Sequence, residues 1–327
     1  MKGVIFERVG DPDVLKVVER SDPNPATGEV LIDVCGTALN YADLLQRRGT
    51  YLMDSGVEAL LGIECSGIIA GTGEGVSGWH VGDRVCALLS GGGYAERVCV
   101  PATQLLPCPE GVSLLDAAAL PEAACTLWSN LRDIGCLQPG ETVLIHGGAG
   151  GVGSLAIQWA RHWGARVLTT AGSSDKLKRC LALGADVGIN YRTDDFVHVV
   201  RDVTQGRGVD LILDNMGAQY LEHNIDALAY DGRIVMIGLQ GGREASVHLG
   251  KMMGKRASLH TTSLRDRSAT AKQAIVAGVV RDVWPLLKAG LIKPVIDRVF
   301  ALGEVSDAHH YMESGCHIGK IVMDSRR

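Results

Sequence analysis

Two kinds of hydrophobic pattern divide the chain. In about the first 120 residues, short apolar runs are broken by Gly and Pro, which is typical of strands in a small, irregular β-rich domain. From Thr142 onward, apolar runs of about five or six residues alternate with helical patterns of ten or more, which predicts βα units and a parallel sheet. The expected strands are 3–7, 15–19, 29–37, 66–70, 84–89 and 94–100 in the first part, and 142–147, 165–170, 186–190, 209–214, 233–238 and 258–262 in the second.

Glycines mark the expected ends of two helices in the second part. The helix 152–163 stops at Gly164 and the helix 175–183 stops at Gly184. After Ala289 the pattern returns to β-like runs at 294–300 and 320–323, around a short helix at 304–313. The chain is therefore predicted to hold a discontinuous β-rich domain, 1–122 and 290–327, with a dinucleotide-binding domain inserted at 123–289.

Two segments match the glycine pattern of a dinucleotide phosphate loop, G-x-G-x-x-G. In the first, Gly73 to Gly78, the residues that follow do not form a helical pattern, so we interpret it as a turn. The second, with Gly148, Gly150 and Gly153, follows the strand TVLIHG and opens the helix at Val152, together with Gly151. This second segment therefore combines a tight turn, a backbone that can closely approach a pyrophosphate, and the N-terminus of a helix. The sequence predicts that a nicotinamide dinucleotide binds here, as a hydride carrier.

The end of the second strand of this domain indicates which dinucleotide binds. NAD enzymes place an acidic residue there, on the ribose 2′-hydroxyl. Here the strand runs into Gly172 and Ser173, and the first acid, Asp175, already belongs to the next helix, where a helix-start role is the simpler interpretation. The amides of Gly172 and Ser173, the Ser173 hydroxyl and the Lys176 ammonium suit a 2′-phosphate instead, so the expected cofactor is NADPH.

Composition and charge indicate the class of protein, its partners and its location in the cell. The chain of 327 residues is 46% hydrophobic and 21% charged, as in ordinary globular proteins. A net charge of -5 without a basic stripe argues against nucleic acid as a partner. No secretory signal and no apolar run near the ~18 residues of a membrane span are evident. The 9 cysteines contain no C-x-x-C pair, which favours reduced thiols in a cytoplasmic protein.

Motifs along nearly the whole chain resemble the zinc-free quinone oxidoreductases related to zeta-crystallin, a branch of the medium-chain dehydrogenase/reductase superfamily. Besides the phosphate loop, with Ala156 and Gln158 beyond it, the matching segments are Asn40 to Tyr51, Gly62 to Gly67, Gly82 to Val85, Gly91 to Glu96, Asp210 to Asp214, Gly232-Arg233, Gly238 to Gly242 and Gly319 to Ile321. The resemblance implies an α/β fold: a GroES-like β-rich catalytic domain plus a Rossmann domain, whose doubly wound parallel sheet binds the dinucleotide.

The resemblance also indicates that no catalytic zinc is bound. Zinc-dependent alcohol dehydrogenases of the superfamily hold the metal with Cys and His side chains of the β-rich domain. Here the His position of the G-H-E motif is Ile63, and the third ligand position carries Glu122. Cys35 remains, but one thiolate does not make a site that needs at least three protein ligands. Without a Lewis acid, the acceptor must carry its own electron sink, as a quinone does.

Site residues follow from the resemblance, each with a simpler alternative. Asn40 and Tyr51 are expected in the catalytic site, Asn40 near the nicotinamide and Tyr51 at the mouth of the substrate cleft; capping and plain packing are the alternatives. Lys320 either reaches a cofactor phosphate or ends a surface strand. We interpret the adjacent His309 and His310 as a solvated helix face rather than a metal site. The other cofactor-binding residues expected are Thr126, Gly148, Gly150, Gly151, Val152, Gly153, Gly172, Ser173, Lys176, Tyr191, Gly238, Leu239, Gln240 and Ser263.

The leading hypothesis is an NADPH:quinone oxidoreductase. A reductase of alkenals or enones on the same scaffold is the close alternative, and an NADPH-binding, crystallin-like protein without catalysis is the alternative of another class. The intact phosphate loop, Asn40 and Tyr51 argue against the last. A small-molecule acceptor is the expected partner. By resemblance we also expect a homodimer, formed through the sheet edge at Ser258 to Thr262.

Overall fold

A computed structural model describes residues 1–51 and 60–327 of the chain. The chain forms two compact units. The discontinuous unit comprises residues 1–125 and 267–327, and the central unit comprises residues 126–266. Each is described by itself below.

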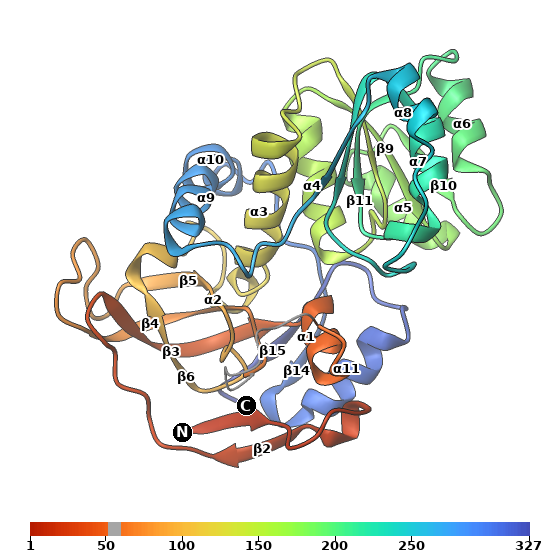
Figure 1. Ribbon diagram of the computed structural model, residues 1–327. Helices are drawn as coiled ribbons and strands as arrows, with labels where there is room; N and C mark the ends of the chain where they lie inside the picture. Colours follow the sequence, from red (N-terminus) through yellow and green to blue (C-terminus); the bar gives the residue numbers. More distant parts are fainter. Residues whose placement is uncertain (52–59) are drawn as a thin grey trace. The chain divides into compact units, whose positions relative to one another are not determined.

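The discontinuous unit is built on a β-sheet that joins both ends of the chain. Its seven strands follow the order β14-β15-β3-β4-β5-β7, and β6 also pairs with β3 (Figure 1). The pairs are antiparallel except β14 with β15, which are parallel. A separate antiparallel pair, β1 with β2, precedes them. The bounds are β1 Lys2–Ile5, β2 Lys16–Glu19, β3 Glu29–Ala38, β4 Glu64–Thr72, β5 Arg84–Leu88, β6 Arg97–Pro101, β7 Leu105–Pro107, β14 Ile296–Ala301 and β15 Lys320–Asp324.

Alternation along β3 explains how this sheet packs. Val30, Ile32 and Val34 are buried, and Asp33 between them is exposed, as expected where one face of a sheet covers a core. The helices of the unit are α1 Tyr41–Arg47, α2 Leu114–Ala117, α3 Pro121–Leu127, α9 Ala269–Asp282, α10 Trp284–Lys288 and α11 Val305–Glu313, with 3₁₀ turns η1 Pro12–Val14, η2 Ala102–Gln104 and η5 Leu302–Glu304; α3 crosses the division between the units.

The helices α9 and α10 lie where the sequence analysis expected the dinucleotide domain to continue. They group instead with the discontinuous unit, because they pack on η2 and β7. The Trp284 indole N–H donates to the carbonyl oxygen of Pro107 at 2.7 Å, and Lys272 Nζ donates to Ser90 Oγ at 3.0 Å. The discontinuous unit therefore resumes at Arg267, whereas the sequence pattern placed this boundary at 290.

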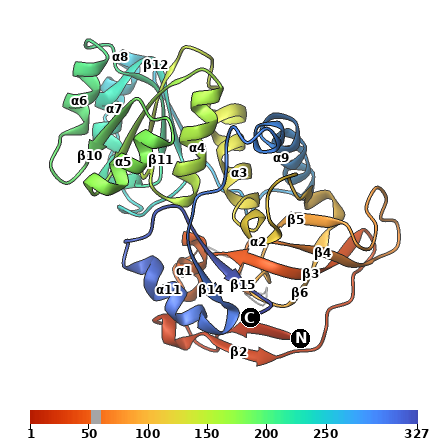
Figure 2. The same cartoon turned by 180° about the vertical axis from the view of Figure 1, so that it is seen from behind.

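The central unit is a parallel sheet with helices on both faces (Figures 1 and 2). Its six strands follow the order β10-β9-β8-β11-β12-β13, and every neighbouring pair is parallel. Counted from β8, this order is 3-2-1-4-5-6, that of doubly wound dinucleotide-binding sheets. The bounds are β8 Thr142–Ile145, β9 Arg166–Ala171, β10 Val187–Asn190, β11 Val209–Asp214, β12 Leu228–Met236, β13 Ser258–Thr261, α4 Gly151–His162, α5 Ser174–Ala182, α6 Phe196–Val203, α7 Leu221–Ala227 and α8 Leu249–Lys255, with the π-helix η3 Trp128–Ile134 and the 3₁₀ turn η4 Gly217–Gln219.

This architecture confirms the expected fold class, and the strand positions follow the hydrophobic pattern closely. All six residues of β11 are buried, as expected for a central parallel strand, and its three consecutive apolar residues lie between Asp210 and Asp214. The glycine-rich segment from Gly73 to Gly78 forms a turn after β4, as predicted. Among the described residues, no helix is both long and apolar enough to cross a membrane.

Candidate active site

Two glycines of the phosphate loop of the central unit leave no room for a side chain. The loop connects β8 to α4, and Gly150 is the N-cap of that helix. A Cβ atom on Gly148 would lie 1.9 Å from Thr169 Oγ1, and one on Gly153 would lie 2.4 Å from the carbonyl oxygen of Gly147. Only glycine fits these positions, so the backbone itself forms the surface that faces a ligand. The first amides of α4, at Gly151, Val152 and Gly153, lie at the helix N-terminus, where unpaired N–H groups and the helix dipole attract a pyrophosphate.

The residues expected around the adenosine ribose converge on Gly172, directly after β9. Ser173 caps α5 by accepting a hydrogen bond from the backbone N–H of Lys176 at 3.3 Å. A Cβ atom on Gly172 would lie 2.4 Å from the Tyr191 hydroxyl and 3.3 Å from Arg192 Nε. The structure thus brings Tyr191 beside Gly172. It adds Arg192, an exposed cation that the sequence analysis missed although it follows Tyr191 directly at the end of β10.

Asn215 lies between two loops at the carboxyl end of the sheet, where a topological switch point binds ligands. Its Nδ2 would lie 2.7 Å from a Cβ on Gly147, and its carbonyl oxygen accepts from the Gln240 N–H at 3.1 Å. Gly238 also approaches Asn215 closely, since its Cβ would lie 3.0 Å from the same carbonyl oxygen. Asn215 Oδ1 is buried, and within 1–51 and 60–327 it has no hydrogen-bond partner. This acceptor and the glycine-lined loop fit a bound dinucleotide.

Thr126 and the segment around Ser263 are connected within the central unit. Asn130 Nδ2 donates to the Thr126 carbonyl oxygen at 2.7 Å, and its Oδ1 accepts from the Thr262 hydroxyl at 2.6 Å. The neighbouring Ser263 hydroxyl donates to Asp266 Oδ2 at 2.6 Å. Asn130, which the sequence analysis did not single out, therefore fixes two predicted cofactor-binding segments relative to each other. Leu239, in the loop after β12, is 43% exposed and offers an apolar surface to a ligand.

In the discontinuous unit, Asn40 belongs to a buried triangle with Glu64 and Lys320. Asn40 Nδ2 donates to Glu64 Oε1 at 2.9 Å, and Asn40 Oδ1 accepts from Lys320 Nζ at 2.7 Å. Lys320 Nζ and Glu64 Oε1 form an ion pair at 2.6 Å. The donor and the acceptor of the amide thus have different partners, which fixes its orientation. Asn40 also occupies the N-cap position of α1, where its backbone N–H donates to Asp43 Oδ2 at 2.8 Å as part of a capping box.

The second carboxylate oxygen of Glu64 also accepts a hydrogen bond. Glu64 Oε2 accepts from the backbone N–H of Glu122 at 2.9 Å, so the residue next to Ile63 is linked to the second position that replaces a zinc ligand. Lys320 is only 5% exposed, and the alternative interpretation of this residue as the end of a surface strand is wrong. Its buried ammonium is needed to compensate the buried Glu64 carboxylate. Whether Lys320 also reaches a cofactor phosphate stays a prediction.

Asp43 ties the start of α1 to two other segments. Its carboxylate accepts from the N–H of Asn40 at 2.8 Å, from the N–H of Gly62 at 3.0 Å and from the Tyr94 hydroxyl at 3.0 Å. Burial raises the pKa of the Asp43 carboxyl, and these donors and Lys320 act against that rise. This function of Asp43 was not predicted, because Gly62 and Tyr94 are distant from it in the chain.

Tyr51 follows α1 and is half-buried, with its backbone N–H donating to the Leu45 carbonyl oxygen at 3.1 Å. The eight residues after it, 52–59, lie outside the described part of the chain. Its expected place at the mouth of a substrate cleft therefore stays a prediction.

The histidine pair on α11 requires a correction. His310 is exposed and contacts Asp13, but His309 is fully buried, so the expected solvated face holds for only one of the two. Arg47 Nη1 lies 3.3 Å from His309 Nδ1, and Tyr94 packs edge-on against the imidazole ring. Burial, followed by the positive charge of Arg47, lowers the pKa of His309 to about 3. Adjacent helix positions point in different directions, so one ring enters the core while the other faces solvent.

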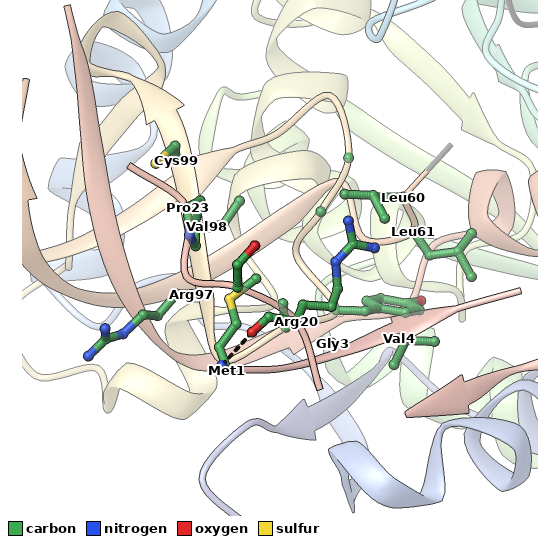
Figure 3. A pocket seen from close by; sticks show the side chains of 15 residues that line it. Met1, Gly3, Val4, Arg20, Pro23, Leu60, Leu61, Arg97, Val98 and Cys99 are labelled. Atoms are coloured by element: carbon green, nitrogen blue, oxygen red, sulfur yellow. Dashed lines mark hydrogen bonds between the residues drawn. The ribbon is translucent and has the colours of Figure 1, made fainter. Parts of the chain in front are cut away.

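A pocket of about 330 Å³ lies elsewhere on the discontinuous unit. Figure 3 shows it between the N-terminal strand and the segment around Val98, with Arg20 and Arg97 among its lining residues. The N-terminal ammonium donates to the Arg20 carbonyl oxygen at 2.8 Å, and Arg97 Nε pairs with Asp33 Oδ1 at 2.8 Å. Neither Asn40 nor Tyr51 lines this pocket, so it is distinct from the candidate site.

Comparison with known proteins agrees with this geometry. Residues 26–110 match the model of the alcohol dehydrogenase GroES-like domain, and residues 151–277 match that of zinc-binding dehydrogenases. A quinone oxidoreductase of Salmonella typhimurium is 33% identical over 94% of this chain and 95% of its own length. A 2-haloacrylate reductase of Burkholderia sp. is 30% identical over 98% and 97%.

The fold is shared with solved structures as well. That of an Escherichia coli quinone oxidoreductase complexed with NADPH superposes with a TM-score of 0.90, at 29% identity, and covers 99% of this chain and 100% of its own. Other curated relatives are much longer proteins, and the chain spans only 13% to 14% of their length.

Proposed function

Because the chain belongs to the zinc-free quinone oxidoreductase branch of the medium-chain dehydrogenase/reductase superfamily, we propose that it transfers a hydride from NADPH to a quinone. The observation that carries this proposal is the glycine-lined loop between β8 and α4, where Gly148 and Gly153 leave space only for backbone. The relatives named as quinone oxidoreductases support the choice of acceptor, and the NADPH complex of the Escherichia coli protein supports the choice of cofactor.

NADPH rather than NADH fits the surroundings of Gly172. Tyr191 and Arg192 lie beside this glycine, and Lys176 is in the first turn of the helix that Ser173 caps. A 2′-phosphate would meet two cations and hydroxyl donors there, whereas the acid that binds a ribose 2′-hydroxyl in NAD enzymes is absent from the end of β9. Asp175 is exposed and pairs with Lys178.

The proposed reaction requires the residues of the chain mainly to bind and orient the reactants. The bound nicotinamide supplies the hydride, and the residues of the chain bind and orient the reactants. The backbone cradle and the N-terminus of α4 hold the pyrophosphate. The Glu64–Lys320 pair holds the Asn40 amide in one orientation. Because a hydroquinone monoanion is a phenolate with a pKa of about 10, as for tyrosine, water protonates it without a positioned acid.

A reductase of activated C=C bonds is the second candidate, because the Burkholderia relative is named for reduction of a haloacrylate. Such a reaction needs a proton at carbon, which is the step that separates the two candidates. The non-catalytic alternative receives no support from the residues, since the buried triangle around Asn40 costs desolvation that a purely structural role does not require.

The deciding experiment is NADPH oxidation by the purified protein with an ortho-quinone, a para-quinone and an enal in parallel. We expect turnover with a quinone, unchanged by EDTA, and NADPH binding more than about tenfold tighter than NADH binding. Lys176→Glu should weaken the binding of NADPH and leave that of NADH. Preference for the enal would favour the reductase of C=C bonds, and absence of turnover with all three acceptors would favour a non-catalytic NADPH-binding protein. Chelator-sensitive activity together with stoichiometric zinc would contradict the zinc-free assignment.

Two further properties are proposed on the same basis. The strand β13 lies at the edge of the central sheet, which suits pairing with β13 of a second copy in a homodimer. We also propose a cytoplasmic location, supported by the 9 free cysteines.

A further inference from the structure

Two cysteines of the discontinuous unit, Cys86 and Cys108, meet across paired strands. Cys86 lies in β5 and Cys108 directly follows β7, the antiparallel neighbour of β5. Cys86 pairs in register with Leu106, and the ladder continues with the Cys108 N–H donating to the Arg84 carbonyl oxygen at 2.9 Å. Because side chains alternate along a strand, Arg84, Cys86 and Cys108 point to the same face of the sheet.

The sulfur of Cys108 has two donors in this arrangement. The Cys86 thiol and the Arg84 side chain each form a hydrogen bond with it, and the guanidinium adds a positive charge. The hydrogen bond from Cys86 and then the charge of Arg84 lower the pKa of Cys108 to about 7, although partial burial acts against this. The same contact, together with burial, raises the pKa of Cys86 well above its usual range. One thiol of the pair is therefore about half ionised at pH 7, and the other carries its proton.

Exposure separates the two thiols in a second way. Cys108 is half-buried, so a small reagent reaches it, whereas Cys86 is fully buried. The Cys108 sulfur also lies 3.7 Å from the Val112 carbonyl oxygen, in a turn with prolines on both sides of the cysteine. Burial raises the pKa of the thiols of Cys35, Cys65, Cys99, Cys125 and Cys180.

We propose that Cys108 and Cys86 form a dithiol site that a peroxide oxidises to an intrachain disulfide, with Cys108 as the attacking group and Cys86 as the resolving group. The Cys108 thiolate attacks one peroxide oxygen, the O–O bond breaks, and a sulfenic acid forms while the leaving hydroxide takes up a proton. The Cys86 sulfur then attacks the Cys108 sulfur, the S–O bond breaks, and the hydroxide leaves with the Cys86 proton as water. For hydrogen peroxide, two thiols lose two electrons and two waters form.

The Cα atoms of Cys86 and Cys108 need to approach each other only slightly for a disulfide to form. Diagonal neighbours on paired strands are about 7–8 Å apart between Cα atoms, and a disulfide requires at most about 6.8 Å. Cys108 lies one residue beyond the end of β7, an edge strand, and the next residue, Pro109, has no N–H with which to continue the ladder. A movement of about 1 Å at this position breaks no ladder bond beyond that of Cys108 itself.

The test uses the full-length protein in which the exposed Cys136 and Cys316 are replaced by Ser, so that they do not consume reagent. The reduced protein is treated with hydrogen peroxide in steps, remaining thiols are blocked with iodoacetamide, and the digest is analysed by mass spectrometry without reduction. We expect the peptide 85–97, which holds only Cys86, to become linked to the peptide that holds Cys108, and dithiothreitol to reverse the link. Because Cys99 and Cys125 lie on the same tryptic peptide, 98–132, Cys99→Ser and Cys125→Ser are the matched controls, and each should leave the link intact.

Two variants separate the roles. In Cys86→Ser, oxidation should stop at a sulfenic acid on Cys108, which dimedone traps. The rate at which Cys108 is alkylated at pH 7 should also fall about tenfold, because the pKa of Cys108 returns towards about 8.5. In Cys108→Ser, Cys86 should stay reduced. The pH dependence of Cys108 alkylation in the parent protein needs no further substitution, so a folding defect of either variant leaves the proposal testable. A disulfide to another cysteine, or Cys108 alkylation without a midpoint near pH 7, would overturn it.

Discussion

The two units hold their predicted site residues in different ways. In the discontinuous unit, buried side chains hold the functional side chain in place. In the central unit, many of the predicted site residues are glycines, which act through their backbone. Asn40 is fixed by Glu64 and Lys320, both almost completely buried. The phosphate loop depends on Gly148 and Gly153, on which a Cβ would collide with neighbouring atoms. The first arrangement couples the site to the stability of its unit, and the second couples it to ligand affinity.

The largest effect should come from breaking the buried ion pair. Lys320→Met leaves the Glu64 carboxylate buried without its cation, and removal of one partner of such a pair costs about 3–5 kcal/mol. Urea denaturation should show a fall of this size in the free energy of unfolding. The control is the double variant Lys320→Met/Glu64→Gln, which removes both charges and should recover most of the loss. A single variant within about 1 kcal/mol of the parent would show that the pair does not support the unit.

In the central unit the corresponding change should affect binding instead. Gly153→Ala brings a Cβ within 2.4 Å of the Gly147 carbonyl oxygen, so the phosphate loop must shift. We expect NADPH affinity to fall about a hundredfold, or about 2.7 kcal/mol, in a fluorescence titration. Gly254→Ala is the matched control, because Gly254 lies in α8 with nothing within 4 Å of the added Cβ. Equal affinities of both variants would contradict the role of the loop.

The acid sensitivity of the discontinuous unit offers a third test. His309 is neutral in the folded state with a pKa of about 3, but an unfolded histidine binds a proton below about pH 6.5. Protons therefore favour unfolding between these values, and stability is lost as the pH falls. Between pH 7 and 5 the loss from this residue should be about 2 kcal/mol.

His309→Phe keeps a ring beside Tyr94 and should abolish this part of the pH dependence, as measured by urea denaturation at both pH values. His310→Gln, a change at the exposed neighbour, should retain it. If His309→Phe and the parent lose the same stability on acidification, the neutral state of this histidine is not what makes the unit sensitive.

The smallest effect is expected at Tyr51. If the tyrosine only orients the acceptor with one hydrogen bond, Tyr51→Phe should lose less than about tenfold in kcat with an ortho-quinone. Steady-state kinetics, with NADPH affinity measured separately, test this. A thousandfold loss at unchanged affinity would make Tyr51 an essential acid and would place the C=C reductase ahead of the quinone reductase.

Local patterns in the sequence predicted the central unit well. Its strands have apolar runs and its phosphate loop is one continuous segment, so the neighbours that determine both are close in the chain. Arg192 was missed for want of a motif, although it lies one residue from Tyr191. In the discontinuous unit the decisive contacts are distant: Lys320 and Asn40 are separated by 280 residues, and Arg47 and His309 by 262. No periodicity reveals such pairs, and this is also why His309 was expected to be exposed.

The position of β15 has a consequence for the order in which the protein is made. This strand lies between β14 and β3, so residues 36–38 of β3 lack their partner until residues 322–324 have been synthesised. The central unit has all six of its strands once β13 is complete. On the ribosome it can therefore finish folding while residues 36–38 of β3 are still without the strand that covers them, and chaperones would protect this short edge of the nascent discontinuous unit.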